Sequence, residues 1–372
     1  MGSSRLSRRI FVRAAGELAA GAALVPWLAC RVSRGGPSDS GIDGAATVDS
    51  AVDAEPMSPE PPEPSETLCR PFLTPVEEFF RQHGGRLQPG WELPALDEGH
   101  GLRILGLVER ELSLDLAALE AEQRHAVRVV NTLLCITGYR GTAIWTGVPV
   151  RVLLERAGAD LMRARQLVCR GADGYRAKLP VAVLQTAGTG HFEPLVAFHM
   201  AGQRLPQDLG FPFRLLAADR YGYQNIKWLE SIEVLEAEPA ADSEGQSHVV
   251  VPTPLLENPP TGGAVAAGRV ELCGFALSGN SGIARVEVQV DGGPPQAAAL
   301  HQLETILAEH PELEGCLQLT QPDLHAFPWA GVWRPWQLTL ELAPGEHRLR
   351  IEVRDLEGQG GDRIDLVVVA TA

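Results

Sequence analysis

The sequence predicts an α+β protein in which a mixed α/β domain precedes a β-sandwich of immunoglobulin type. Before position 238, β-branched apolar runs typical of buried strands alternate with helix-like segments. After position 248, apolar and polar residues alternate with period two between short turns rich in Gly, Pro and Asp, a pattern typical of antiparallel sandwiches. An acidic, Pro-containing linker, 237–247, separates the two patterns.

The first 30 residues match a twin-arginine export signal. The run Ser7-Arg8-Arg9-Ile10-Phe11 precedes a mildly apolar stretch, 14–29, that Glu17 interrupts. Such a stretch is too short and too weak for a membrane span, which needs about 20 apolar residues. The twin-arginine route carries proteins that are already folded, mainly when a cofactor must be inserted before export. We therefore expect an exported, periplasmic protein that carries a cofactor.

Residues 28–68 raise the question of a membrane tether. The tripeptide Leu28-Ala29-Cys30 is compatible with a lipoprotein cleavage site, which would leave a lipid anchor on Cys30, but Trp27 is atypical there. Both the lipidated and the free form stay open. Residues 31–68 are rich in Pro, Glu and Ser and cannot bury enough apolar surface to offset their chain entropy, which predicts a disordered tether.

Composition narrows the classes of partner and metal site. A net charge of −15 over 372 residues argues against nucleic acid, whose binding relies on Lys and Arg, and is compatible with a basic electron-carrier protein. No two cysteines are closely spaced, which excludes a zinc ribbon and a C-x-x-C-H haem site, so no haem is expected in this chain. An oxidising compartment permits disulfides, but spacing does not pair the cysteines. The six cysteines are Cys30, Cys69, Cys135, Cys169, Cys273 and Cys316.

Strand and helix signals outline the first domain, 69–238. The helix expected at 150–157 has Gly158 as its stop signal. The strand expected at 127–134 runs directly into Cys135, so we expect this cysteine at a strand end. The remaining expected elements are strands at 102–108, 166–170 and 232–235 and a short helix within 112–119.

The second domain, 248–372, carries the alternating pattern. Strands are expected at 285–290, 336–342 and 347–353, and Asp291-Gly292-Gly293 forms a turn after the first of them. Residues 296–328 interrupt the pattern as an insertion, with a helix expected at 299–308. The sequence assigns no role to this insertion.

Five motifs in order make residues 72–372 similar to the sulfite oxidase family of molybdopterin-dependent oxidoreductases. They are Leu73–His83, Leu133–Cys135 with Trp145–Pro149, Gly210–Arg214, Asn225–Leu229 and Trp333–Trp336. The resemblance implies a sulfite-oxidase-like molybdopterin-binding domain at 69–238 and an immunoglobulin-like, dimerisation-type sandwich at 248–372.

The resemblance assigns Cys135 as the molybdenum ligand and a catalytic residue. A thiolate is a soft donor suited to a metal that changes oxidation state. Alone, a cysteine at this place is more typical of core packing, and the surrounding motifs favour the ligand role. The pterin also carries a phosphate, which calls for fixed donors and positive charge. By resemblance the cofactor-binding residues are Phe80, Arg81, Gln82, His83, Cys135, Asp173, Arg214, Asn225, Ile226 and Lys227.

Three arginines are the predicted substrate residues, because a small oxyanion is bound by guanidinium forks. They are Arg81, Arg140 and Arg334, and Arg140 lies five residues beyond Cys135, as one arginine of the family does. For a single arginine, a solvated surface charge is the commoner role. Trp333 and Trp336 either line this pocket or pack in the sandwich core.

The implied activity is two-electron oxygen-atom transfer on sulfite or a similar small sulfur compound, with electrons passed to a separate carrier such as a cytochrome c. A homodimer is the default assembly. Two alternatives stay open: a periplasmic sulfoxide reductase, and a cofactor-free binding or structural protein that kept the fold. Phe198 and Leu209 favour the last, because the family's motifs carry Tyr and His at these positions.

Overall fold

The computed structural model describes residues 69–82, 92–185, 190–236, 249–260 and 263–372. The predicted export signal, Cys30, the tether and the linker 237–247 therefore lie outside the described residues, and so does His83. Every α-helix in the described part of the chain is too short or too polar to cross a membrane.

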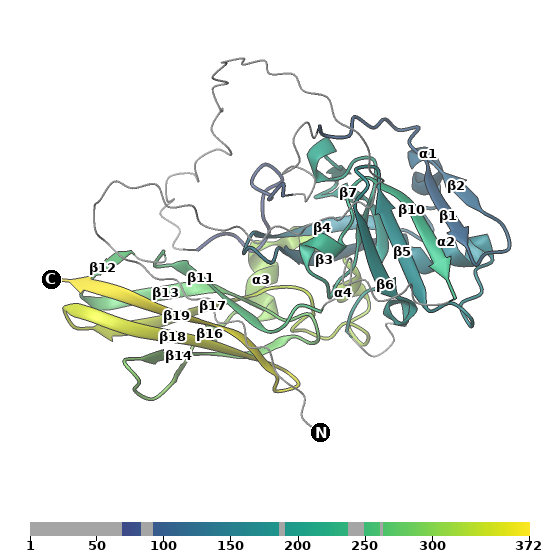
Figure 1. The fold of residues 1–372 in the computed structure, drawn as a ribbon. Helices are drawn as coiled ribbons and strands as arrows, with labels where there is room; N and C mark the ends of the chain where they lie inside the picture. Colours follow the sequence, from purple (N-terminus) through teal and green to yellow (C-terminus); the bar gives the residue numbers. More distant parts are fainter. Residues whose placement is uncertain (1–68, 83–91, 186–189, 237–248, 261–262) are drawn as a thin grey trace, which may run out of the picture. The chain divides into compact units, whose positions relative to one another are not determined.

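The first domain contains a five-stranded sheet in the order β2-β1-β10-β5-β6, in which only the β1–β10 pair is parallel (Figure 1). Its apolar side packs with α2 into a core that includes Leu102, Leu153 and Ile232, all fully buried. The elements are β1 (Leu102–Gly106), β2 (Leu112–Leu114), α1 (Leu116–Glu120), α2 (Val150–Ala157), β5 (Gln166–Gly171), β6 (Arg176–Pro180) and β10 (Leu229–Leu235).

Most expected elements of this domain are confirmed, and one is corrected. Helix α2 has the predicted bounds, and Gly158 ends it in the left-handed region at φ 68°. The helix expected at 112–119 is wrong for its first half, where β2 pairs with β1. The reason is Asp115, whose carboxylate caps the helix by accepting from Ala118 N at 2.8 Å, so α1 begins only after it.

A second sheet, β3-β4-β7-β8 with β9 on β7, carries the candidate site. Register divides its central hairpin into two faces, because residues opposite each other in an antiparallel pair point the same way. The side chains of Val129 and Trp145 point to one face of the hairpin, and those of Val130 and Ile144 point to the other. The strands are β3 (Val127–Leu134), β4 (Arg140–Pro149), β7 (Leu195–Met200), β8 (Gln203–Arg204) and β9 (Arg214–Leu216).

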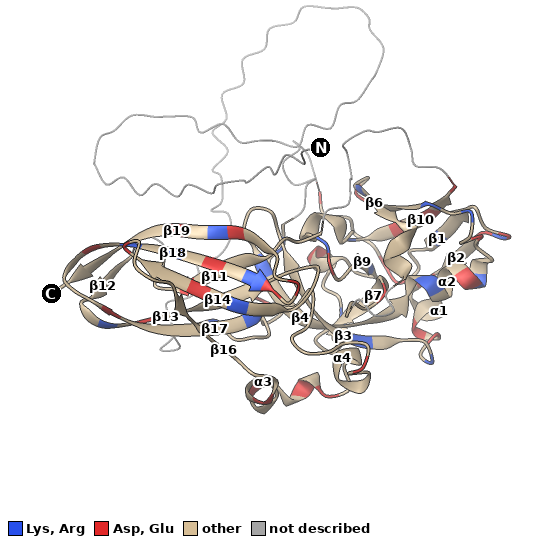
Figure 2. Ribbon diagram, turned by 90° about the horizontal axis from the view of Figure 1, so that it is seen from below, with Lys and Arg blue, Asp and Glu red and all other residues tan. Residues whose placement is uncertain are grey.

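The second domain is a β-sandwich. Its sheets have the orders β11-β13-β17-β16 and β12-β19-β18-β14-β15, and they enclose a core that includes Val286, Trp336 and Ile351. Both charge types lie on β14 and β19, where alternate residues face solvent (Figure 2). The strands are β11 (Thr253–Asn258), β12 (Ala264–Ala266), β13 (Gly268–Leu277), β14 (Ile283–Val290), β15 (Gln296–Ala297), β16 (Ala299–Leu300), β17 (Arg334–Leu342), β18 (Gly345–Asp355) and β19 (Gly360–Thr371).

The insertion, 296–328, covers the edge of β3. It contains β15 and β16, the helix α3 (Leu303–Glu309) and the short helix α4 (Leu317–Thr320), so the helix expected at 299–308 begins later than predicted. The Gln318 amide binds both backbone groups of Val130, donating to its O at 2.8 Å and accepting from its N at 3.2 Å. The insertion thereby satisfies strand groups that an open sheet edge would expose.

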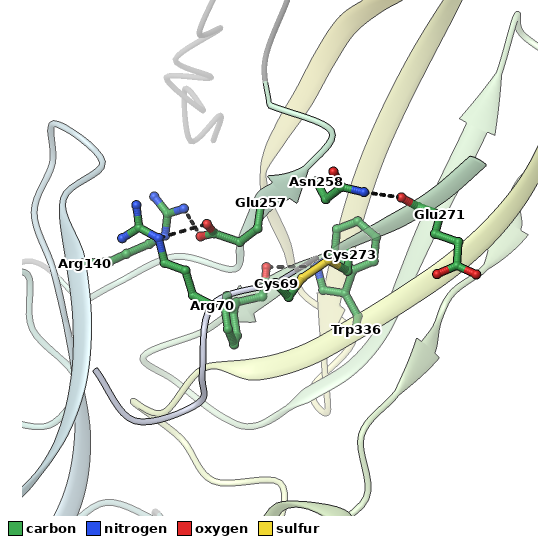
Figure 3. The surroundings of a disulfide bond; sticks show 9 residues. Cys69, Arg70, Arg140, Glu257, Asn258, Glu271, Cys273 and Trp336 are labelled. Atoms are coloured by element: carbon green, nitrogen blue, oxygen red, sulfur yellow. Dashed lines mark hydrogen bonds and ion pairs between the residues drawn. A yellow bond between two sulfur atoms is a disulfide. The ribbon is translucent and has the colours of Figure 1, made fainter. Parts of the chain in front are cut away.

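Trp333 joins the two domains. Its ring stacks on Phe275 at 4.0 Å, its Nε1 donates to Phe72 O at 2.8 Å, and its backbone N donates to Thr132 Oγ1 at 2.9 Å. Trp333 and Trp336 are therefore both core residues rather than pocket walls. A disulfide between Cys69 and Cys273, 204 positions apart, links the same regions covalently (Figure 3).

Candidate active site

Cys135 lies in the turn between β3 and β4. Its N donates to Tyr139 O at 2.7 Å, and its O accepts from Gly138 N at 2.9 Å, which closes the turn tightly. Gly138 has φ 93°, a conformation that a side chain would oppose. The Cys135 thiol lies 3.1 Å from Thr137 Oγ1 and is partly exposed. The strand end thus presents a thiol at the surface of the second sheet.

The other free cysteines of the described chain do not compete for this role. Cys169 and Cys316 are buried, and burial raises the pKa of the Cys169 thiol to about 12 and that of Cys316 to about 11. A thiol with so high a pKa remains protonated at neutral pH, and metal binding requires the thiolate. Cys135 is therefore the one accessible thiol among the described residues.

The segment 69–82 connects the Cys135 turn to a group of charged residues. Phe80 stacks between Phe79, at 5.3 Å, and Tyr139 of the turn, at 6.4 Å. The next residue, Arg81, donates to the carbonyls of Val76, Glu77 and Phe79 and forms an ion pair with Asp208. Its guanidinium therefore orders the segment and also reaches Asp208.

Arg214 is the centre of this cationic cluster, which we define as Arg81, Arg214 and Lys227. It is only 2% exposed, and it donates to Leu209 O at 3.0 Å and Asn225 O at 2.9 Å. Burial lowers its pKa to about 9. Its Cζ lies 5.3 Å from the centroid of Trp145, and both Arg214 Nε and Trp145 Nε1 have no hydrogen-bond partner in the described part of the chain.

Lys227 adds a second confined cation. Its Nζ donates to Asp208 O at 2.7 Å, and burial together with Arg214 lowers its pKa to about 7. Asp173 lies close to it, and burial raises the pKa of that carboxyl. Positive charge thus exceeds negative charge in a cluster that is largely shielded from solvent, and a bound anion stabilises such a cluster.

These observations fit the phosphate-bearing cofactor that the resemblance implies. Among the described residues, two buried N–H groups lack partners, and three cations have two carboxylates near them. One accessible thiol lies on the turn that stacks on Phe80. No three His, Cys, Asp or Glu side chains within the described ranges group as a metal site. Cys135 would supply one sulfur ligand, so a metal bound there would take its further ligands from the cofactor.

Three predicted cofactor residues have other surroundings. The Asn225 amide is used by the backbone: its Oδ1 accepts from Ala217 N at 2.7 Å, and its Nδ2 donates to Tyr221 O at 3.0 Å. The Ile226 side chain belongs to the core of the first sheet. Both side chains are thus engaged within the protein, and their assignment as cofactor residues stays a prediction. Gln82 is exposed, without a contact that assigns it a role.

Arg140 and Arg334 are each engaged away from the cationic cluster. Arg140 donates to Gly138 O at 3.1 Å within the Cys135 turn and forms an ion pair with Glu257 on β11. Arg334 donates to Ile283 O at 2.9 Å and His301 O at 3.1 Å, both in the second domain. Each of the three predicted substrate arginines therefore has partners of its own, and their role in binding substrate stays a prediction.

The two departures from the family pattern have structural explanations. Phe198 is 4% exposed and belongs to the core of the first sheet, where a phenyl ring packs without a polar partner. Leu209 is buried, and its backbone O, which any residue supplies, accepts from Arg214. Neither substitution removes a group on which the cationic cluster depends.

Sequence reasoning missed Trp145, Asp208 and Glu257 as site residues. Trp145 was noted only as part of a motif, although it supplies the surface under Arg214. Asp208 follows Pro206-Gln207 in a short helix, and its carboxylate pairs with Arg81. The positions of these three side chains depend on strand register and on contacts between segments far apart in the sequence, which no local signal encodes.

Comparisons with known proteins identify similar domains and relatives. The oxidoreductase molybdopterin-binding domain model matches residues 91–242. Mitochondrial sulfite oxidase of Mus musculus is 29% identical over 347 residues, covering 80% of this chain and 58% of that protein. The Homo sapiens protein is 28% identical with the same coverage. A putative protein-methionine-sulfoxide reductase subunit of Azospira oryzae is 28% identical over 150 residues, 40% of this chain and 53% of its own length.

The fold has a solved counterpart. The structure of the sulfane dehydrogenase SoxCD from Paracoccus pantotrophus matches with a TM-score of 0.62 at 19% identity, over 77% of this chain and 74% of that one. Residues 91–242 thus match a molybdopterin-binding oxidoreductase domain, and a β-sandwich follows it in the chain. The chain is thus similar to the sulfite oxidase family of molybdenum-dependent oxidoreductases. It spans 58% of the length of the mammalian relatives it matches.

Proposed function

We propose that this protein oxidises a small sulfur compound, with sulfite as the lead substrate, by two-electron oxygen-atom transfer at a molybdenum–molybdopterin cofactor. Sulfite takes an oxygen atom that derives from water, giving sulfate, two protons and two electrons. The electrons pass to a separate carrier such as a cytochrome c. The observation that carries the proposal is one accessible thiol, Cys135, on a turn whose Tyr139 stacks on Phe80, the residue before Arg81 of the cationic cluster.

The roles of the residues follow from their surroundings. Cys135 supplies the soft ligand that ties the cofactor's metal to the protein. Arg214 and Lys227 hold the anionic end of the cofactor, and Arg81 keeps the segment 69–82 against them. The bound cofactor supplies the redox chemistry, and the protein supplies binding, orientation and charge. Arg140, on the Cys135 turn, is the nearest candidate to orient an oxyanion.

A sulfoxide reductase is the second candidate, and one observation favours it. Arg140 is paired with Glu257 and Arg334 with backbone carbonyls, so the described side chains offer less free positive charge than an oxyanion pocket uses. The similarity to a putative sulfoxide reductase subunit points the same way. Reduction of a neutral sulfoxide requires no arginine fork.

Metal analysis and a substrate panel test these functions. Protein from a host that makes the cofactor should contain about one molybdenum per chain, and Cys135→Ser should lose the thiolate-to-metal absorption and turnover. Cys169→Ala is the matched control and should keep both. Sulfite with an oxidised mediator, and a sulfoxide with a reduced one, separate the two reactions. Wild-type protein without molybdenum would refute both and favour the cofactor-free alternative.

The cellular setting is a further part of the proposal. Export by the twin-arginine route to the periplasm, with or without a lipid on Cys30, would follow insertion of the cofactor. The Cys69–Cys273 disulfide supports an oxidising compartment, where such bonds persist. The double substitution Arg8→Lys with Arg9→Lys should retain the protein in the cytoplasm, which fractionation measures. A homodimer through the immunoglobulin-like sandwich is tested by the mass of the protein in solution.

A further inference from the structure

Glu257 places a carboxylate between two arginines at the junction of the domains. Its Oε2 lies 3.2 Å from Arg70 Nε, and its Oε1 pairs with Arg140 Nη2 (Figure 3). The side chains of Glu257 and Arg140 are 9% and 17% exposed. Such confinement makes the pair less open to screening by salt than a surface ion pair.

Arg140 belongs to the turn that carries the thiol. Its Nη1 donates to Gly138 O at 3.1 Å, and Gly138 N donates to Cys135 O at 2.9 Å. The guanidinium that lies on the Cys135 turn is therefore neutralised by a residue from the second domain. A substrate oxyanion and the Glu257 carboxylate would compete for the same N–H groups. Arg140 Nε is buried and has no partner in the described chain.

The position of Glu257 is fixed from behind. Asn258, the next residue on β11, stands opposite Cys273 on β13, and its Nδ2 donates to Glu271 O at 2.6 Å. Cys273 is bonded to Cys69, whose neighbour Arg70 holds the second oxygen of Glu257. Strand pairing and the disulfide thus hold the carboxylate against Arg140.

We propose that Glu257 is a specificity-determining residue that weakens the binding of small oxyanions at the Cys135 turn by occupying Arg140. The inference rests on the proposed function, since it concerns the substrate of that site. It assigns Arg70 the opposite effect. Arg70 offsets part of the Glu257 charge, so removing Arg70 leaves a more negative junction and weakens anion binding further.

Sulfate, which needs no turnover, is the probe, and calorimetry on the full-length protein measures its affinity. Each variant is measured with and without the additional substitution Arg140→Met. The sulfate binding that this substitution removes is the binding at the Arg140 site. Glu257→Gln should bind sulfate about tenfold more tightly at this site, because one charge-assisted competitor is removed. In cofactor-loaded enzyme the KM for sulfite should fall by a similar factor, with kcat little changed.

Two further variants separate charge from structure. Arg70→Gln should weaken sulfate binding, whereas a purely structural junction would make both variants weaker binders and less stable. Glu271→Gln is the matched control, since this carboxylate lies on β13 near the disulfide, is half exposed and pairs with Arg269 alone among the described residues. It should leave sulfate affinity unchanged.

If Glu257→Gln binds sulfate no more tightly than the wild type, or if neither protein binds sulfate at the Arg140 site, the proposal is overturned. Should Glu257→Gln not fold, Glu257→Asp and Arg70→Gln carry the test. Glu257→Asp must then raise the sulfate affinity, and Arg70→Gln must lower it. Failure of the proposed function would appear separately, as absence of molybdenum or of sulfite oxidation, while the sulfate measurement still decides the role of Glu257.

Discussion

The Cζ of Arg214, on β9, lies 5.3 Å from the ring centroid of Trp145, on β4, and both side chains are buried. A cation over an indole face is stabilised by the ring, but the ring does not replace a counterion. The described chain offers Arg214 backbone carbonyls and no carboxylate. This relationship makes Arg214 the strongest single argument for a bound anion.

The first prediction concerns that guanidinium. Arg214→Gln removes a charged donor, and a hydrogen bond to a charged group contributes about 1.5–3 kcal/mol, so the affinity for an anion at the cluster should fall about ten- to a hundredfold. The molybdenum content of protein from a host that makes the cofactor and the rise in melting temperature with sulfate measure this. Arg103→Gln, an exposed arginine paired with Glu111, is the control. Equal molybdenum content in both variants would contradict the assignment.

The second prediction concerns pH. The pKa of Lys227 is lowered to about 7, so between that value and the ordinary lysine range, about 10.4, the unfolded chain binds a proton that the folded protein releases. The cofactor-free protein should therefore gain stability from Lys227 as pH rises above about 7. A bound anion favours the charged amine, so anion binding takes up a proton and weakens over the same range.

Sulfate measures this coupling, because its own charge is constant over these pH values. The increase in melting temperature that sulfate gives should be larger at pH 6 than at pH 9 for cofactor-free wild-type protein. Lys227→Met should remove most of the difference. Lys178, buried on β6, is a control position, and its replacement should leave the difference between pH 6 and pH 9 unchanged. A sulfate effect that does not change with pH would rule out Lys227 as the coupled group.

Local signals were sufficient for the elements and for the thiol. The strand β3 and the helix α2 follow from β-branched runs, apolar spacing and the Gly158 stop, all of which are set by neighbouring residues. Cys135 could be placed at a strand end for the same reason. Its neighbours Thr137 and Tyr139, which contact the thiol and close the turn, lie within four positions of it.

Long-range pairing decided what the sequence left open. The partner of Arg140 is Glu257, 117 positions away, and the partner of Cys69 is Cys273, 204 positions away. Neither pairing has a local signature, because it depends on how β11 and β13 meet the first domain. The direction of the Arg334 side chain likewise depends on the packing of β17 against the insertion.

The third prediction separates the two readings of Arg334. Arg334→Met should leave the buried carbonyl of Ile283 and the partly buried carbonyl of His301 without these donors, which costs about 1–3 kcal/mol of unfolding free energy. Burial lowers the pKa of the Arg334 guanidinium, and no nearby carboxylate offsets this effect within the described chain. Urea unfolding measures the loss, and the KM for sulfite should stay within about twofold. A strong rise in KM at unchanged stability would restore the pocket role.

The fourth prediction concerns the insertion. Gln318 binds both backbone groups of Val130, and both residues are buried. Gln318→Ala leaves a buried N–H and C=O unsatisfied, at a cost of about 1–3 kcal/mol for each group that water does not reach. The edge of β3, which leads into the Cys135 turn, should open more often.

Hydrogen exchange at the Val130 amide measures this opening directly, and it should be faster by at least the factor that the loss of unfolding free energy implies. Gln318→Glu retains the acceptor for Val130 N but loses the donor to Val130 O, so it should fall between wild type and Gln318→Ala. Gln321→Ala, an exposed glutamine at the end of α4, is the control. If Val130 exchanges equally slowly in all of these proteins, the insertion does not protect β3, and the turn that presents Cys135 is held by the hairpin alone.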